Sequence, residues 1–296
     1  MNELVGTGVA LVSPFTADLQ LDIESLRSLV RHCYKGGVDY LVILGTTGES
    51  VTLNKDEKKL VIQTVIQENN GLLPLVIGIG GNSTTAVVEE LEHTDLSPFA
   101  AVLSVSPYYN KPSQEGIYQH YKAIAAASSK PVILYNVPGR TGSNVLPETV
   151  IRLARDCKNI VGVKEASGEL AQIQEVISGR PDGFLVISGD DATAKDTVKM
   201  GGQGVISVLG QALPDMFSRM IREAAGPNTE QADALHRELE AAMELIFEEG
   251  NPSGIKAMLQ VLGICDAFVR LPLTEATGDL KSRIATYMKT VSGINA

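Results

Sequence analysis

Short runs of apolar residues alternate with longer segments of helical period over about the first 210 residues of the chain. Each run is continuous rather than alternating, which is typical of parallel strands that are buried on both faces. The pattern predicts eight strands, at residues 5–12, 40–44, 75–79, 100–105, 132–135, 160–163, 184–187 and 204–208.

The segments between these runs carry helix signals. After Asp22, a candidate N-cap, apolar residues fall on one helical face until Gly36, which ends the helix. Asn54 and Glu57 have the spacing of a capping box, and Pro147 stands where a first helical turn tolerates proline. The spacing therefore predicts a helix after each strand.

Eight strand–helix units in succession favour a closed (β/α)8 barrel, the TIM barrel, over an open doubly wound sheet. After residue 226 the strand-like runs cease, and helices are predicted at 229–249, 252–262 and 275–291. We therefore expect an α/β protein with two domains. A barrel over residues 1–226 would carry any catalytic site, and a helical domain over residues 227–296 would pack on it or on a neighbouring subunit.

The composition argues against functions that involve nucleic acids or membranes. The 296 residues include 44% hydrophobic residues, and the formal net charge is −10 without a basic cluster. Nucleic acid and anionic membranes are therefore not expected as partners. No apolar run reaches the length of a membrane span, and the N-terminal sequence lacks the features of a signal peptide. We expect a cytoplasmic protein.

Candidate ligands for metals and cofactors are sparse. Cys33, Cys157 and Cys265 are far apart and odd in number, so reduced thiols are expected. The four histidines lack partners at ligand spacing, so no metal site is predicted. The clusters GIGGN and GGQG do not have the glycine spacing of a dinucleotide site. We expect no nicotinamide or flavin.

Unusual residues follow five of the predicted strands at the same end. They are GTTGES (45–50), SPYYNKP (106–112), YNVPGRTG (135–142), Lys164 and SGDDA (188–192). In a barrel the C-terminal strand ends meet on one rim, where active sites lie. Each motif also has a plain structural interpretation: turn glycines, packed tyrosines, or a solvated loop charge at Arg140. However, glycine-flanked threonines and an arginine on a fixed loop also suit a carboxylate ligand.

Lys164 follows the apolar run IVGV directly. In one interpretation its side chain extends out of the strand end and pairs with Glu165. In the other, the chain uses a desolvated amine, which releases its proton more readily and can attack a carbonyl carbon. Hydroxyl groups and carboxylate anchors on the same rim favour the second interpretation, so we predict Schiff-base chemistry at Lys164.

Taken together, these motifs resemble a known family. GTTGES, PYYNKPSQEGIYQHY, YNVPGRTG, VGVKEASG, SGDDA and GGQGVISV are similar, in order and spacing, to the signatures of the dihydrodipicolinate synthase (4-hydroxy-tetrahydrodipicolinate synthase) family. This family belongs to the pyruvate-dependent class I aldolases, which also include N-acetylneuraminate lyase. The resemblance covers essentially the whole chain, including NPSGIKAML and RLPL near its end.

The resemblance implies a lyase that condenses pyruvate with L-aspartate 4-semialdehyde, the first committed step of diaminopimelate and lysine biosynthesis, without a metal or organic cofactor. Lys164 would form an imine with pyruvate, and Tyr135 would shuttle protons beside it. Thr46 and Tyr109 would complete a hydroxyl relay. Tyr109 would come from the neighbouring subunit of a tight dimer, and two such dimers would form a homotetramer.

The same resemblance implies four substrate-binding positions. Thr47 would hold the pyruvate carboxylate, and Arg140 would bind the carboxylate of the semialdehyde at the site entrance. Gly189 and Ile206 would line the pocket. Two alternatives stay open. One is another pyruvate-dependent aldolase that acts on a sugar acid, such as an N-acetylneuraminate lyase or a 2-keto-3-deoxy-sugar-acid aldolase, and the other is an inactive binding barrel. Arg140 favours the synthase over both.

Many members of the family are inhibited by lysine, in a pocket near the turn after GTTGE. The resemblance places this possible effector pocket at Ser50, Val51, Lys55, Lys58, Asn82, Ala86 and Tyr108. Lys55 and Lys58 stand where sensitive relatives often have histidine, and Ala86 stands where they have a glutamate. Because a cationic effector would face two lysines without its carboxylate partner, we predict weak or no inhibition by lysine.

Overall fold

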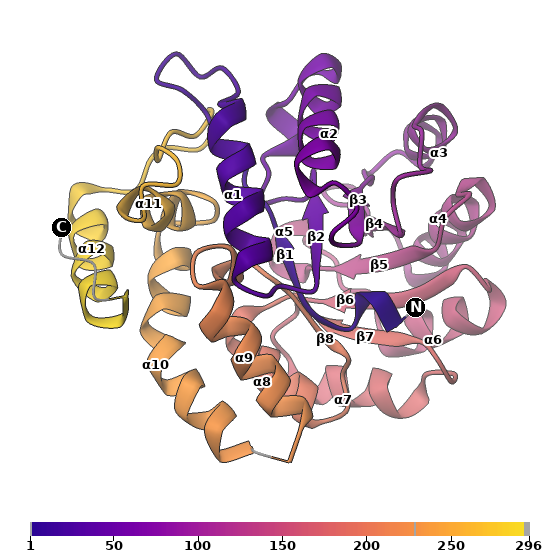
Figure 1. The fold of residues 1–296 in the computed structure, drawn as a ribbon. Coiled ribbons are helices and arrows are strands. Elements are labelled where there is room, and N and C mark those ends of the chain that lie inside the picture. Colours follow the sequence, from indigo (N-terminus) through magenta and orange to yellow (C-terminus); the bar gives the residue numbers. More distant parts are fainter. Residues whose placement is uncertain (1, 228, 293–296) are drawn as a thin grey trace.

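The structure is a computed structural model that describes residues 2–227 and 229–292. Within this part of the chain, parallel strands close into a barrel in sequence order (Figure 1). The strands are β1 (Gly6–Ala10), β2 (Tyr40–Ile43), β3 (Leu75–Gly78), β4 (Ala101–Val105), β5 (Val132–Asn136), β6 (Ile160–Glu165), β7 (Leu185–Ser188) and β8 (Gly204–Ser207). All eight predicted strands and the predicted fold class are confirmed.

Helices surround the barrel and follow the strands. They are α1 (Ile23–Lys35), α2 (Lys55–Asn69), α3 (Thr84–His93), α4 (Gln114–Ala127), α5 (Pro138–Thr141), α6 (Pro147–Asp156), α7 (Leu170–Gly179), α8 (Asp191–Lys199) and α9 (Pro214–Ala225). Short 3-10 helices lie at Asn2–Leu4, Ser50–Thr52 and Leu209–Gln211. The sequence pattern did not predict the four-residue helix α5, which carries Arg140.

The predicted helix starts are confirmed. The Asp22 side chain accepts a hydrogen bond from the Ser25 backbone N–H at 3.0 Å. Asn54 and Glu57 form the capping box of α2, and Pro147 lies in the first turn of α6. The Asp22 and Asn54 side chains bond backbone N–H groups that a helix start otherwise leaves without partners, whereas Pro147 has no N–H group to leave unbonded.

Side chains alternate between the two faces of each strand. A large hydrophobic cluster contains Val163 and lies between the strands and the helices. A second cluster, which includes Tyr40 and Tyr135, uses the alternate strand positions and fills the interior of the barrel. A Cβ atom at Gly8 would lie 2.1 Å from the Tyr40 ring, so glycine is required there. Lys164 follows Val163 and therefore points into the barrel mouth.

A C-terminal segment, residues 229–292, contains α10 (Thr229–Glu248), α11 (Ser253–Val261) and α12 (Gly278–Ser292). These are the three helices that the sequence predicted. They lie on one side of the barrel, with α10 against α8 and α9 (Figure 1). Their apolar side chains join the same hydrophobic cluster that lies outside the strands. The segment therefore packs on its own barrel, and the division into two domains stays a prediction.

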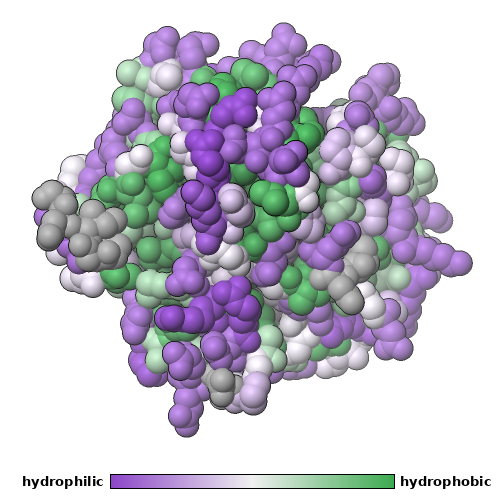
Figure 2. Space-filling view, viewed as in Figure 1, coloured by the Kyte–Doolittle hydropathy of each residue, from purple (hydrophilic) through white to green (hydrophobic). Residues whose placement is uncertain are grey.

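No helix in the described residues is long and apolar enough to cross a membrane. On the face seen in Figure 2, hydrophilic side chains predominate, with hydrophobic residues exposed between them. Cys33, Cys157 and Cys265 are free thiols and are buried. Within residues 2–227 and 229–292, no group of histidine, cysteine or acidic side chains is arranged to hold a metal ion.

Candidate active site

Lys164 and Tyr135 lie side by side at the mouth of the barrel. They are register partners on β6 and β5, and Ile187 of β7 is the partner of Lys164 on its other side. The Lys164 Nζ atom lies 4.4 Å from the centroid of the Tyr135 ring. Lys164 is 5% exposed and Tyr135 is 7% exposed. The structure thus places a largely desolvated amine next to a phenol.

The environment of Lys164 leaves its amine without a fixed partner. In the part of the chain that the structure describes, no hydrogen bond or ion pair reaches the Lys164 Nζ atom. Gly189 closes one side of the lysine side chain, since a Cβ atom there would lie 3.0 Å from Lys164 Cε. Ile206 is buried in the same interior cluster as Tyr135. An amine held by packing alone can move onto a carbonyl carbon without breaking an ion pair.

The alternative interpretation, in which Lys164 pairs with Glu165, is wrong. Successive residues of a strand point to opposite faces, and the Glu165 side chain lies outside the barrel, next to α7. Its carboxylate accepts hydrogen bonds from Asn136 Nδ2 at 2.9 Å, from the Ser167 backbone N–H at 2.8 Å and from Gln172 Nε2 at 3.1 Å. Burial raises the pKa of Glu165.

The residues that are hydrogen-bonded to Glu165 also fix the chain that follows Arg140. Asn136 Oδ1 accepts a hydrogen bond from the Val145 backbone N–H at 2.9 Å, and Asn144 Nδ2 donates to Gln172 Oε1 at 2.7 Å. These bonds connect β5, β6 and α7 to the turn after α5. Arg140 itself is exposed, so its guanidinium is available to a ligand while its backbone is held in place.

The 45–50 loop follows β2 and holds the two threonines differently. Thr47 is 3% exposed, and its hydroxyl accepts a hydrogen bond from Asn251 Nδ2 at 3.0 Å. Thr46 is exposed. Glu49, two residues further on, has a left-handed backbone with φ of 51° and a buried side chain. The loop thus presents Thr46 to solvent and fixes Thr47 against the C-terminal segment.

In the described part of the chain, Tyr109 is not bonded to the other predicted catalytic residues. It is 88% exposed and has a φ of 71°. No hydrogen bond within residues 2–227 and 229–292 joins Tyr109 or Thr46 to Tyr135 or Lys164. One chain therefore brings together Lys164, Tyr135, Gly189 and Ile206, whereas Thr46, Tyr109 and Arg140 are exposed around them.

Three of the seven predicted effector residues border a hollow of about 930 Å³ between α2 and α3. Lys55, Lys58 and Ala86 contribute to its lining, whereas Ser50, Val51, Asn82 and Tyr108 do not. The Asn82 amide donates a hydrogen bond to the Tyr108 carbonyl at 3.2 Å. On the wall formed by α3, Glu90 is paired with Lys58 at 3.5 Å.

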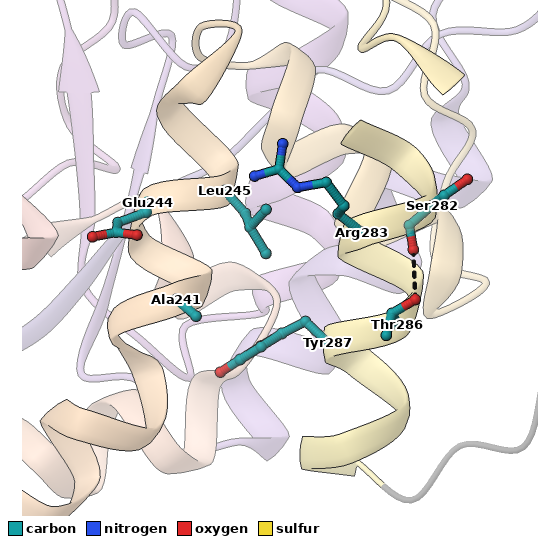
Figure 3. Close-up of a pocket in the computed structure, with 7 residues that line it drawn as sticks. All are labelled: Ala241, Glu244, Leu245, Ser282, Arg283, Thr286 and Tyr287. Carbon is teal, nitrogen blue, oxygen red and sulfur yellow. Dashed lines mark hydrogen bonds between the residues drawn. The ribbon is translucent and has the colours of Figure 1, made fainter. Parts of the chain in front are cut away.

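A second hollow, of about 430 Å³, lies between α10 and α12 (Figure 3). The Arg283 and Tyr287 side chains extend from α12 toward α10. Arg283 is paired with Glu248 at 2.6 Å, and the Tyr287 hydroxyl donates a hydrogen bond to the Glu238 carbonyl at 2.8 Å. Because these polar groups already have partners, the hollow offers little to a polar ligand.

Sequence reasoning did not predict the structural roles of five residues that surround the site. They are Glu49, Asn136, Glu165, Asn251 and Lys256. One signal was present: Lys256 interrupts the apolar run SGIKAML in α11, where a helix that packs on a core has no need of a charge. The asparagines had no such signal, because surface turns use the same residue type.

The fold and the site define a (β/α)8-barrel protein with a desolvated amine at the C-terminal ends of its strands, an arrangement suited to imine chemistry. A model of the dihydrodipicolinate synthetase family matches residues 3–291. The 4-hydroxy-tetrahydrodipicolinate synthase of Flavobacterium psychrophilum is 54% identical over 292 residues, which cover 99% of this chain and 100% of that protein. The chain belongs to the dihydrodipicolinate synthetase family.

Solved structures agree with this assignment. The dihydrodipicolinate synthase of Thermotoga maritima superposes with a TM-score of 0.95 at 38% identity, over 98% of this chain and 99% of that one. The synthase of Cyanidioschyzon merolae, solved with lysine bound, has a TM-score of 0.94 at 35% identity and covers 99% of each chain. The likeness extends over the barrel and the C-terminal segment alike.

Proposed function

We propose that this chain catalyses the condensation of pyruvate with L-aspartate 4-semialdehyde to 4-hydroxy-tetrahydrodipicolinate, the entry step of diaminopimelate and lysine biosynthesis. The observation that carries this proposal is the buried Lys164 amine, which lies against the Tyr135 ring and has no ion-pair partner among the described residues. The family to which the chain belongs supports the choice of substrates.

The first half of the reaction is imine formation. The Lys164 amine attacks C2 of pyruvate, and the tetrahedral adduct loses water to form an iminium. The positive nitrogen then withdraws electrons from C2, which makes the pyruvate methyl group acidic. Tyr135, in register beside Lys164, is placed to pass protons to and from the adduct. Because the iminium accepts the electron pair, a phenol suffices and no strong base is required.

The second half forms the new carbon–carbon bond. Loss of a methyl proton gives an enamine, which attacks the aldehyde carbon of the semialdehyde. The substrate's own amine then attacks C2, and Lys164 leaves as a free amine when the ring closes. Thr47 holds the pyruvate carboxylate, and Arg140 holds the carboxylate of the semialdehyde. Gly189 and Ile206 shape the space around the adduct.

We further propose that the working enzyme is a cytoplasmic homotetramer built from two tight dimers. Tyr109 is almost fully exposed in one chain, although a phenol that transfers protons must lie within hydrogen-bond reach of the reacting group or of another member of the relay. A neighbouring subunit would receive Tyr109 beside its own Thr46 and Tyr135 and would complete the hydroxyl relay.

The test is a coupled assay with pyruvate and L-aspartate 4-semialdehyde, in which the next reductase oxidises NADPH. We expect turnover with this substrate pair. In parallel, borohydride with pyruvate alone should reduce the imine and label the protein at Lys164. Labelling without turnover would support an aldolase that acts on a sugar acid. The absence of both would support an inactive barrel.

Arg140→Ala should lower kcat/KM for the semialdehyde roughly 10- to 100-fold, because a hydrogen-bonded ion pair with its carboxylate is lost. Borohydride labelling with pyruvate should stay at the wild-type rate, since pyruvate does not use this arginine. Arg155→Ala, which removes an exposed arginine on α6, is the matched control. If pyruvate labelling fell by the same factor as kcat/KM, Arg140 would be assigned to pyruvate binding instead.

Lysine should inhibit this enzyme weakly or not at all. Lys55 and Lys58 occupy predicted effector positions, where they repel a cationic effector, and Ala86 supplies no carboxylate to bind it. Glu90 on α3 is already paired with Lys58. The measurement is a lysine titration of the coupled assay at subsaturating pyruvate. Half-inhibition at a sub-millimolar concentration would contradict the prediction. The double variant Lys58→His, Ala86→Glu should gain sensitivity.

A further inference from the structure

The C-terminal segment reaches the 45–50 loop with three hydrogen bonds. Asn251 Nδ2 donates to Thr47 Oγ1 at 3.0 Å, and Lys256 Nζ donates to Glu49 Oε1 at 2.5 Å. The Arg270 backbone N–H donates to the other Glu49 oxygen at 3.0 Å. The bonded residues are more than 200 positions apart in sequence. The loop that presents the two threonines is therefore held from outside the barrel.

The ion pair at the centre of this contact is fully buried. The side chains of Lys256 and Glu49 are 0% and 1% exposed. Lys256 Nζ also donates to the Phe268 carbonyl at 2.8 Å and lies 4.2 Å from the centroid of the Phe15 ring. Burial lowers the pKa of Lys256, and the Glu49 carboxylate opposes this change. A charged pair in such a place needs several well-placed partners, and these are present.

Glu49 shapes the turn that carries Thr46. Its backbone N–H donates to the Thr46 carbonyl at 3.0 Å, and its φ of 51° lies in the left-handed region, which a residue with a side chain seldom adopts. The Gly48 carbonyl accepts a hydrogen bond from Ser13 Oγ at 2.7 Å. Because Lys256 and Arg270 anchor the side chain of Glu49, its backbone stays in the unfavourable left-handed conformation. This conformation fixes the positions of the two threonines.

Asn251 determines what the Thr47 hydroxyl can do. A threonine hydroxyl has one proton to donate, and here its oxygen accepts the Asn251 amide proton. Within residues 2–227 and 229–292, no acceptor receives the proton of the Thr47 hydroxyl, which is buried. The hydroxyl is thus set as a hydrogen-bond donor for a group that arrives from outside, and a carboxylate oxygen is such a group.

We propose that Asn251 and Lys256 are positioning residues for pyruvate binding: Asn251 orients the Thr47 hydroxyl toward the substrate carboxylate, and Lys256 fixes the 45–50 loop through Glu49. This inference rests on the proposed function and deepens it. The C-terminal segment is then part of the pyruvate site, in addition to its packing on the barrel. A structural role alone would alter stability and leave pyruvate affinity unchanged.

The test measures the pyruvate concentration that gives half-maximal borohydride labelling, together with the thermal midpoint of each variant. Asn251→Ala should raise this concentration roughly 10-fold, with little change in the labelling rate at saturation. Asn251→Asp fills the same space but faces Thr47 with an anion that repels the substrate carboxylate, so it should raise the concentration further. Asn159→Ala is the matched control, since that amide donates to the Ala125 carbonyl just before β6, at the opposite end of the barrel.

A double-mutant cycle shows whether Asn251 acts through Thr47. In a Thr47→Val background, Asn251→Ala should change pyruvate affinity less than twofold, because the hydroxyl that it orients is absent. If pyruvate and borohydride label the wild type, but the pyruvate concentration for half-maximal labelling of both Asn251 variants stays within twofold of the wild-type value, this inference is overturned. The proposed function would then remain intact. A wild type that pyruvate and borohydride leave unlabelled would overturn both.

Discussion

Lys164→Ala should lose at least about four orders of magnitude in turnover of pyruvate and semialdehyde, and all borohydride labelling with pyruvate. The loss is this large because, in the proposed mechanism, the amine forms the covalent intermediate and no neighbouring group can replace it. Tyr135 lies beside Lys164 but cannot form an imine, and Glu165 faces away from the barrel interior. The measurements are coupled initial rates and the mass of the intact protein after reduction.

The control for this variant must separate chemistry from folding. Lys164 is 5% exposed, so its removal leaves a space in the barrel mouth, and the thermal midpoint should be measured with the rates. Lys158→Ala removes an exposed lysine that precedes β6 at the opposite end of the barrel, and it should keep wild-type rates. Turnover of Lys164→Ala above about 1% of the wild-type rate would exclude an imine at this residue.

The barrel was predictable because its signal is local. Each strand is a continuous apolar run, and several helices have a cap or a proline at their start, so every strand and all the longer helices could be located from a window of about ten residues. The end of β6 shows the limit of this signal. The apolar run stops at Val163, whereas the strand continues through Lys164 and Glu165. One of these side chains points into the barrel and the other out of it, and the run of residue types alone left both interpretations of Lys164 open.

Contacts between distant segments could not be predicted in this way. Asn136 and Gln172 meet at Glu165, and Asn251 meets Thr47, only because the folded barrel brings separate strands and helices together. Neither periodicity nor turn chemistry encodes such pairs. The exposed position of Tyr109 is a related case, because in the dimer that we propose its partners belong to a neighbouring subunit.

Lys256→Met should destabilise the fold by about 3–5 kcal/mol, because it leaves the buried Glu49 carboxylate without its cation. The measurement is denaturant or thermal unfolding, in which the midpoint falls by roughly 2–4 °C for each kcal/mol lost. The double variant Glu49→Gln, Lys256→Met should recover most of this loss, since no charge is then buried and the glutamine oxygen can still accept from the Arg270 N–H. Lys281→Met removes a partly exposed pair with Glu275 on the same segment and should cost less than about 1 kcal/mol.

The Glu49→Gln, Lys256→Met double variant also separates two functions of the ion pair. If Lys256 and Glu49 only hold the C-terminal segment on the barrel, the double variant should bind pyruvate as the wild type does once its stability is restored. If the carboxylate also maintains the left-handed backbone at Glu49, the restored fold should still bind pyruvate more weakly, because a neutral glutamine bonded to one N–H anchors the turn less firmly than a carboxylate with two partners. We expect this second outcome. Full recovery of both stability and pyruvate affinity would limit the pair to a structural role, and the orientation of Thr47 would then depend on Asn251 alone.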